Sequence, residues 1–165
     1  MNNLFYDGFN SKLIETALFE SILEIPVLSA PERIIIPTRA VPFSKRNHIN
    51  SDTDMLVFYE KDPIFREFIS CPQKFDNELN HVNIFSTPDC SVYRDMPLWE
   101  QLANIGVGRS MGYYEQQQGK YVIPNVRWGD ERTYTTKFLP EKIAFAGVEK
   151  NSIVSVGSYG QLKNK

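Results

Sequence analysis

The feature that most constrains the fold is a series of short apolar runs separated by segments of helical spacing or polar composition. Five runs are strand candidates: RIIIPT (33–38), MLVFYE (55–60), VNIFS (82–86), KYVIPNVRW (120–128) and SIVSVGS (152–158). Their β-branched and aromatic residues suit strands that are covered on both faces. Because helical segments alternate with these runs, we predict a single α/β domain, 1–165, with a mostly parallel sheet flanked by helices.

Three segments between or before the runs predict helices. Residues 11–24 repeat apolar side chains at helical spacing, and Pro26 ends the pattern. Asp62 followed by Pro63 is a typical helix start. Pro97 opens a longer helical segment, in which three glycines predict a kink or an early stop: Gly106, Gly108 and Gly112.

Composition narrows the class of protein. The chain has 165 residues with a net charge of -2, so no overall positive charge attracts nucleic acid or an anionic membrane surface. No apolar stretch approaches the roughly 20 residues of a membrane helix, and the first residues lack the pattern of a secretory signal. Cys71 and Cys90 show no metal or disulfide spacing. We therefore predict a cytoplasmic protein that does not contact membranes.

The end of the chain predicts an incomplete sheet. Only a few residues follow the strand expected at 152–158, so no obvious element covers that side. An unpaired strand edge is a ready site for pairing with another chain. Self-association into a homodimer is one alternative that this ending suggests.

Charged and aromatic residues gather where several of the predicted strands end. In parallel α/β folds, ligands collect at the carboxyl ends of the strands, where loops vary over a rigid sheet. This rule gives the ligand-binding candidates Arg39, Tyr93, Arg94, Asn125, Arg127, Trp128 and Arg132, with Tyr159 after the last run. It also gives three candidate catalytic carboxylates: Asp89, Asp95 and Asp130.

Two interpretations of these charges stay open. In the functional one, arginines bind phosphate or carboxylate groups, while carboxylates act as general bases or hold a divalent metal ion, the one cofactor that the pattern suggests. In the structural one, the same groups pair with each other and fasten the loops. Asp95 then favours the start of the next helix, Asp130 is a turn residue, and Trp128 packs at the rim. Asp89 has no such structural explanation.

Three motifs resemble a known family. RAVPFSKR (39–46), TPDCSVYRDMP (87–97) and IPNVRWGDERTY (123–134) are similar to the signature of domain-of-unknown-function family 4417. The resemblance implies a core at 33–160, preceded by a helical extension at 1–30, and an origin in bacteria, phages and other mobile elements. It implies no activity, because none is established for the family. Its members typically continue with a further helix and strand, so we expect this chain to be a short form.

Two functions of different classes follow as hypotheses. In the first, the Asp/Arg pocket binds an anionic ligand such as a nucleotide or nucleic-acid phosphate, and hydrolysis with Asp89 as base is the chemistry expected of an enzyme built on it. In the second, the protein is a non-catalytic binder that inhibits a host defence or replication factor. Its surface would then include exposed aromatic residues, for which Tyr113, Tyr114 and Tyr121 are candidates.

Overall fold

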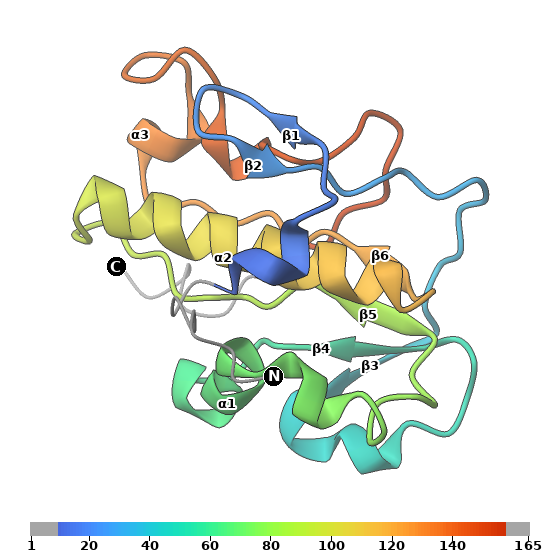
Figure 1. The fold of residues 1–165 in the computed structure, drawn as a ribbon. Coiled ribbons are helices and arrows are strands. Elements are labelled where there is room, and N and C mark those ends of the chain that lie inside the picture. The colour runs from blue at the N-terminus through green and yellow to red at the C-terminus, as the bar shows by residue number, and fades with distance from the viewer. Residues whose placement is uncertain (1–9, 158–165) are drawn as a thin grey trace.

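A four-stranded parallel sheet forms the centre of the protein. The computed structural model describes residues 10–157 (Figure 1). The strands are β3 (Arg39–Pro42), β4 (Asp54–Val57), β5 (Ile84–Ser86) and β6 (Tyr121–Ile123), and they lie side by side in chain order. Each neighbouring pair is parallel. The predicted α/β class with a mostly parallel sheet is confirmed.

Three of the predicted apolar runs contain strands. Runs 55–60 and 82–86 supply most of β4 and all of β5, and run 120–128 supplies β6, which ends before Pro124. Proline lacks the N–H that would continue the ladder, so this end was predictable. Leu56 and Phe85 occupy paired positions, and Phe85 pairs in turn with Val122, so one face of the sheet is apolar across three strands.

The other two runs are not strands within the described residues. Run 33–38 precedes β3 and leaves Ile34 and Ile36 exposed, while the backbone N–H of Ile35 donates to the Tyr121 hydroxyl. Run 152–157 makes only an isolated parallel bridge between Ser155 and Asn125. Both runs were predicted as strands because they are apolar. A strand also needs a neighbouring strand to pair with, and these runs have none within the described residues. Residues 158–165, including Tyr159, lie outside the described part.

The helices connect successive strands over the apolar face. A short 3-10 helix (Asp62–Ile64) leads into α1 (Arg66–Ser70) between β4 and β5, and α2 (Leu98–Gln117) joins β5 to β6. Right-handed crossovers between parallel strands in chain order place all the connections on one face. The remaining helices are α3 (Glu131–Tyr134) and 3-10 helices Phe43–His48, Pro72–Phe75 and Ile143–Phe145.

The glycines of α2 allow close packing instead of breaking the helix. The predicted kink or early stop is wrong, since α2 continues through all three. A Cβ atom on Gly108 would lie 3.0 Å from the main-chain oxygen of Pro88, and one on Gly112 would overlap the Thr87 side chain. The helix therefore lies directly on the loop that follows β5. Tertiary contact outweighs the roughly 1 kcal/mol per glycine that helix propensity costs.

The prediction of a helix over residues 11–24 is also wrong for most of that segment. Only Ser11–Ile14 forms a 3-10 helix, and an antiparallel hairpin of β1 (Phe19–Glu20) and β2 (Ile25–Pro26) follows. Ser21 and Glu24, in the turn, have φ angles of 72° and 51°, which a right-handed helix does not contain. Leu18 and Ile22, which the helical pattern would bury, are exposed.

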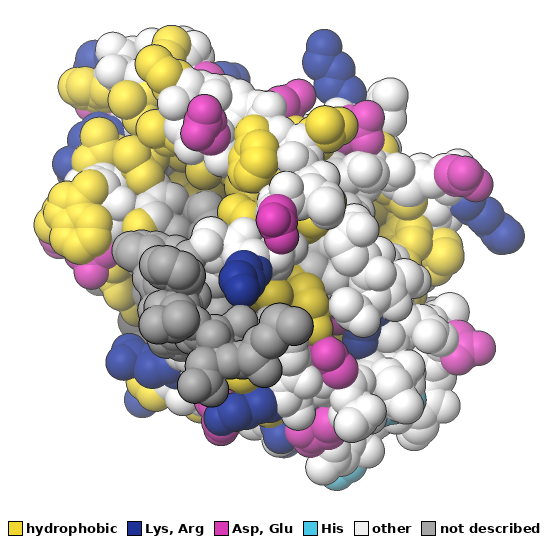
Figure 2. Space-filling model, in the orientation of Figure 1, with side chains coloured by type: hydrophobic (Ala, Val, Ile, Leu, Met, Phe, Trp, Pro, Cys, Tyr) yellow, Lys and Arg dark blue, Asp and Glu magenta, His cyan; other side chains and the backbone are white. Residues whose placement is uncertain are grey.

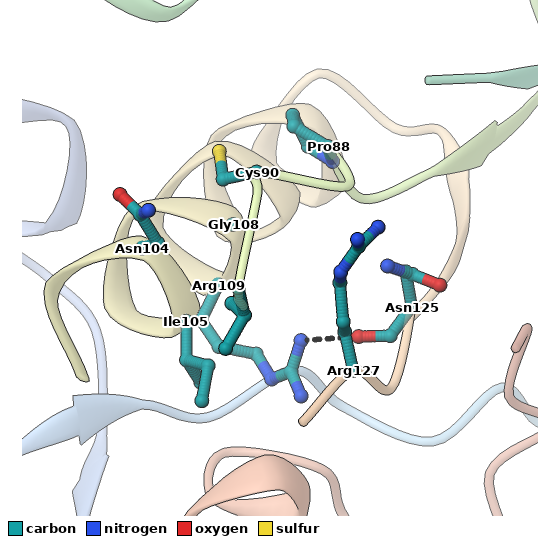
Figure 3. Close-up of a pocket in the computed structure, with 9 residues that line it drawn as sticks. Pro88, Cys90, Asn104, Ile105, Gly108, Arg109, Asn125 and Arg127 are labelled. Atoms are coloured by element: carbon teal, nitrogen blue, oxygen red, sulfur yellow. Dashed lines mark hydrogen bonds between the residues drawn. The ribbon is translucent and has the colours of Figure 1, made fainter. Parts of the chain in front are cut away.

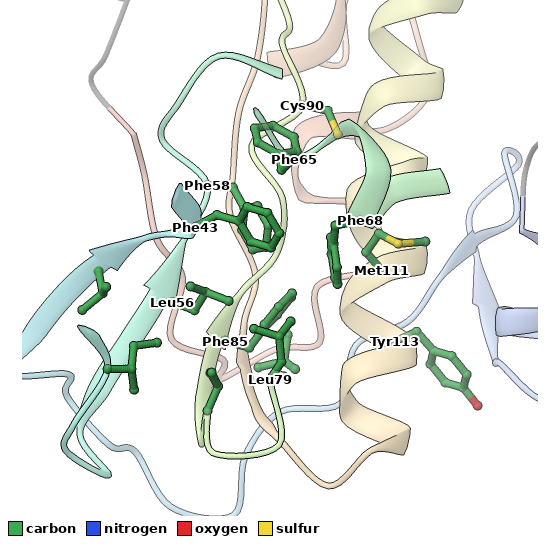
Figure 4. Packing of buried hydrophobic residues seen from close by; sticks show 14 of the residues in the cluster. Phe43, Leu56, Phe58, Phe65, Phe68, Leu79, Phe85, Cys90, Met111 and Tyr113 are labelled. Carbon is green, nitrogen blue, oxygen red and sulfur yellow. The ribbon is translucent and has the colours of Figure 1, made fainter. Parts of the chain in front are cut away.

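Phenylalanine rings fill the space between the sheet and the helices. Phe58, which follows β4, is fully buried, and its ring lies 5.2–5.4 Å from the rings of Phe43, Phe65, Phe68 and Phe85. Figure 4 shows these rings between the strands and α2, with Met111 facing them from the helix. This cluster fixes α1 and α2 on the sheet and so fixes the loops at its carboxyl edge.

Candidate functional site

Loops that follow β4, β5 and β6 meet at the carboxyl edge of the sheet. A buried ion pair joins two of them: Arg127 Nη1 donates to Asp89 Oδ2. Asn125 Nδ2 donates to the other Asp89 oxygen at 2.6 Å, and the Tyr59 hydroxyl donates to Asn125 Oδ1 at 3.2 Å. Tyr59, Asp89 and Arg127 are more than 25 residues apart in sequence, yet the parallel sheet brings them together.

Burial governs the chemistry of this pair. The Asp89 side chain is 5% exposed, and that of Arg127 is 12% exposed. Burial raises the pKa of the Asp89 carboxyl; Arg127 and Asn125 oppose this rise, and nearby Asp62 adds to it. Asp89 is thus a carboxylate that depends on its partners for charge compensation. Loss of either partner would leave a buried group uncompensated.

An open groove of about 600 Å³ lies in front of the ion pair. Its walls come from the loop after β4 with the start of α1, from the loop after β5, and from the first turns of α2. The lining residues are Glu60, Lys61, Asp62, Pro63, Arg66, Asp89, Ser91, Tyr93, Met96, Glu100, Asn104 and Arg127. The volume is within the range of small-molecule sites, about 300–1,000 Å³.

Two acidic residues of the groove are already hydrogen-bonded. Asp62 accepts from the backbone N–H of Ser91 at 3.1 Å and from its hydroxyl at 2.7 Å. Glu60 accepts from the backbone N–H of Ser44 at 2.9 Å and from its hydroxyl at 2.5 Å. These bonds fasten the loop after β4 to its neighbours and occupy the carboxylates.

The cations of the same groove are less engaged. Within residues 10–157, the exposed side chains of Lys61 and Arg66 make no ion pair or hydrogen bond. Arg127 donates through Nη1, but its buried Nε has no hydrogen-bond partner there. Buried donors in proteins are nearly always satisfied, so this one indicates a missing acceptor such as water or a ligand atom.

A second arginine supports the site from behind. Arg109 of α2 is fully buried and donates to three main-chain oxygens, those of Asn125, Ala144 and Ala146, each at 2.9 Å. Figure 3 shows its guanidinium reaching the oxygen of Asn125. This arginine and Arg127 both line a cavity of about 10 Å³, roughly the space of one water. Burial lowers the pKa of Arg109 to about 10.

Arg39, expected in the pocket, lies at the opposite edge of the sheet. It is the first residue of β3 and pairs with Asp54, the first residue of β4, through Nε at 3.0 Å and Nη2 at 2.5 Å. Hydrogen bonds from Arg39 lower the pKa of Asp54 to about 2. Because run 33–38 is not a strand, Arg39 begins a strand instead of following one. It does not line the groove.

Asp130 and Arg132 serve the local structure beside the groove. Asp130 caps α3 by accepting from the backbone N–H of Arg132 at 2.9 Å, and the two side chains form an ion pair at 2.7 Å. Arg132 also donates to the main-chain oxygens of Arg94 and Met96 at 3.3 and 3.1 Å. Side-chain hydrogen bonds from Arg132 lower the pKa of Asp130 to about 2. Together these bonds fasten the 94–96 loop.

The other candidates divide between the groove and its surroundings. Tyr93 lines the groove, whereas the exposed Arg94 and Asp95 do not. Trp128 packs its ring 4.9 Å from that of Tyr134, outside the groove. The structure therefore brings together Asp89, Tyr93, Arg127 and, through Asp89, Asn125.

Sequence reasoning missed the side of the groove formed by Lys61, Asp62 and Arg66. The signal was present, because Lys61 and Asp62 directly follow the predicted strand 55–60, to which the carboxyl-end rule applies equally. Asp62 and Pro63 were interpreted only as a helix start. Ser91 and Asn104 carry no comparable signal, since their position depends on how α2 lies on the β5 loop.

Metal ligands do not cluster in the described part of the chain. Among residues 10–157, no group of three or more His, Cys, Asp or Glu side chains could hold a metal ion. In the same residues, no helix is both long and apolar enough to cross a membrane.

Comparison with known proteins settles the family. The family model described as a domain of unknown function (DUF4417) matches residues 17–165. The chain belongs to this family. The match covers the strands of the sheet and the groove, and its start at residue 17 lies within the extension predicted at 1–30.

Relatives of the chain are phage proteins. The Gene 1 protein of Mycobacterium phage L5 is 28% identical over 120 residues, which are 73% of this chain and 49% of that protein. The Gene 1 protein of Mycobacterium phage D29 is 29% identical over 110 residues, 67% of this chain and 38% of that protein. The chain thus spans half or less of the length of these relatives. No solved structure is significantly similar to it.

Proposed function

We propose that this family member binds a phosphate-bearing anionic ligand in the groove at the carboxyl edge of the sheet. The observation that carries the proposal is the state of the charges around the groove. Asp62 and Glu60 are hydrogen-bonded to serines, and Asp89 pairs with Arg127. Within residues 10–157, Glu100 is the groove carboxylate without a partner, whereas Lys61, Arg66 and the Nε atom of Arg127 all lack one. Unsatisfied cationic donors that line one groove favour a ligand with several acceptor oxygens.

Arg127 is the group best placed to contact such a ligand. Asp89, itself held by Asn125, fixes the orientation of this guanidinium, and a planar, fixed guanidinium binds phosphate through two parallel hydrogen bonds. Lys61 and Arg66 add charge at the rim. Because burial strengthens electrostatic interactions, the floor of the groove contributes more per contact than its exposed rim.

The geometry favours binding over hydrolysis. Both oxygens of Asp89 accept hydrogen bonds, one from Asn125 and one from Arg127, so this carboxylate orients the arginine. A general base needs an oxygen directed at the water that it activates. Asp89 fits the role of a positioning residue in a binding site better than that of a base.

Removing the two rim cations tests the proposal. The double variant Lys61→Ala/Arg66→Ala loses two charge-assisted contacts at the exposed rim, each worth up to about 1 kcal/mol, so affinity for inorganic tripolyphosphate should fall about tenfold. Titration calorimetry with the wild-type chain and the variant measures this. The thermal unfolding midpoint without ligand should not change, because neither exposed side chain makes a hydrogen bond or ion pair within residues 10–157.

A matched control removes the same charge elsewhere. Lys45→Ala/Lys142→Ala deletes two exposed lysines that do not line the groove, and it should bind tripolyphosphate as the wild-type chain does. Equal losses in both double variants would mean that only net charge matters. No binding of tripolyphosphate or ATP to the wild-type chain would contradict the proposed function.

A second candidate function is contact with a host protein, and a different surface favours it. Leu23, Leu102 and Leu139 pack on a small buried cluster of Val92, Ile105 and Ile143. Around it, large apolar side chains are exposed: Leu18, Phe19, Ile22, Trp99, Tyr134, Phe138 and Phe145. Figure 2 shows apolar side chains gathered where Figure 1 draws β1, α3 and the start of α2. Of the three aromatics expected on such a surface, Tyr113 and Tyr114 are instead buried and Tyr121 is half-buried.

Charged substitutions on this surface distinguish the two functions. If the protein binds a host factor here, a pull-down from a lysate of the bacterial host should recover one partner at near-equal stoichiometry. Ile22→Asp/Trp99→Asp should then lose the partner, and Lys61→Ala/Arg66→Ala should keep it. Recovery of nothing above the background of the bare resin would count against this candidate.

A further inference from the structure

Tyr93 is an exposed aromatic residue that its neighbours hold in place. Its side chain is 56% exposed, yet the Arg127 guanidinium carbon lies 6.0 Å from the centre of its ring. Its hydroxyl lies 2.9 Å from the hydroxyl of Ser91, which donates in turn to Asp62 at 2.7 Å. Exposed tyrosines normally rotate freely, so two anchoring contacts indicate a ring prepared for a partner.

From this arrangement we propose that the ligand of the groove is a free nucleotide whose base stacks on Tyr93. The inference rests on the proposed function, and it narrows the anionic ligand to one chemical class. An aromatic ring that lines a groove beside phosphate-binding cations is the usual means of binding a base, because every base has a π-face to stack. A ring already held in place has less conformational entropy to lose on binding.

Trp128, the other aromatic ligand-binding candidate taken from the sequence, does not have this geometry. Its ring packs 4.9 Å from Tyr134, which lies 6.2 Å from Phe145. That row of rings belongs to the packing around α3. Tyr93 is the aromatic side chain among the groove's lining residues.

An acidic residue of the groove also favours a nucleotide over a bare phosphate. Glu100, partly buried, lines the groove and has no hydrogen-bond or ion-pair partner for its carboxylate within residues 10–157. A bare polyphosphate offers this carboxylate mainly acceptor oxygens, which it repels. Sugar hydroxyls donate, and a carboxylate is the group that commonly accepts from them in nucleotide sites.

Size and charge favour a free nucleotide over a nucleic-acid strand. The groove of about 600 Å³ is that of a small-molecule site. A strand would need a track of cations along its backbone, but the chain has a net charge of -2 and the two rim cations lie close together on the chain. A single nucleotide can contact the cations through its phosphates, Tyr93 through its base and Glu100 through its sugar.

Calorimetric titrations with ATP and with inorganic tripolyphosphate test the inference, because the two share the phosphate chain and differ in the nucleoside. The wild-type chain should bind ATP about tenfold or more tightly than tripolyphosphate, the fold-change expected from stacking one base. Tyr93→Ala should remove this difference while leaving the affinity for tripolyphosphate within about twofold. Tyr93→Phe keeps the ring and should retain most of the preference. Phe138→Ala, which removes an exposed ring outside the groove, should behave as the wild-type chain.

The outcomes separate this inference from the proposed function. Equal affinities for ATP and tripolyphosphate, unaffected by Tyr93→Ala, would overturn the nucleotide assignment and leave anion binding in place. A single-stranded oligonucleotide that binds more tightly than ATP would overturn it in favour of a nucleic-acid strand. Failure of every anion to bind would overturn both.

Discussion

Replacing Arg109 with methionine is expected to lower the free energy of unfolding by about 3–5 kcal/mol. The substitution keeps most of the aliphatic volume but removes the donors to the main-chain oxygens of Asn125, Ala144 and Ala146. Each buried acceptor left without a donor costs about 1–3 kcal/mol, partly offset because a buried charge is also removed. Urea unfolding followed by circular dichroism measures the change.

Two further variants define the cause. Arg109→Lys keeps the charge but has a single nitrogen, which cannot reach three oxygens in the planar arrangement of a guanidinium, so it should recover only part of the loss. Arg94→Met removes an exposed arginine whose side chain makes no hydrogen bond or ion pair within the described residues, and its effect should stay within about 0.5 kcal/mol. Equal stability of Arg109→Met and the wild-type chain would show that the three bonds contribute nothing net.

Phe58→Ala is the second substitution with a large expected effect, again about 3–5 kcal/mol of unfolding free energy. The Phe58 ring is fully buried and packs against four other phenylalanines, so its removal loses transfer free energy and leaves a cavity. The neighbours belong to the sheet, to α1 and to adjoining segments, and this limits how far they can move inward to fill the space.

The same experiment includes a matched control. Phe138→Ala removes a ring that is 53% exposed, and it should cost less than about 1 kcal/mol. Phe58→Leu leaves a smaller cavity and should fall between the two. A loss below 1 kcal/mol for Phe58→Ala would mean that the core rearranges around the gap, which the close packing of the rings argues against.

The predicted strands show what the local sequence pattern can predict and what it cannot. Runs 55–60, 82–86 and 120–128 were located correctly because their apolar residues pair with each other across the sheet. Run 33–38 is as apolar, but its backbone pairs with a tyrosine hydroxyl and not with a strand. Composition reports how well a segment suits burial, while strand formation also needs a neighbour that lies elsewhere in the sequence.

Helix α2 shows the opposite error. Local propensity predicted a break at Gly106, Gly108 and Gly112, and the helix continues through them because close contact with the β5 loop requires small residues. Propensity is a difference of about 1 kcal/mol per residue, which packing readily exceeds. The hairpin of β1 and β2 is a similar case. Residues 11–24 have helical spacing of apolar side chains, but Ser21 and Glu24 adopt positive φ angles that form a turn instead of a helix.

Sequence alone determined the parallel α/β class, the family and the position of Asp89, Asn125 and Arg127 after two of the strands, because order along the chain fixes which strand ends face the same edge. Only the tertiary structure decided which charges meet. It paired Asp89 with Arg127, moved Arg39 to the far edge with Asp54, joined Asp130 to Arg132 and left Lys61 and Arg66 at the groove without partners within residues 10–157. The physical reason is that an ion pair depends on distances of a few ångströms between segments far apart in sequence, which residue type and spacing do not encode.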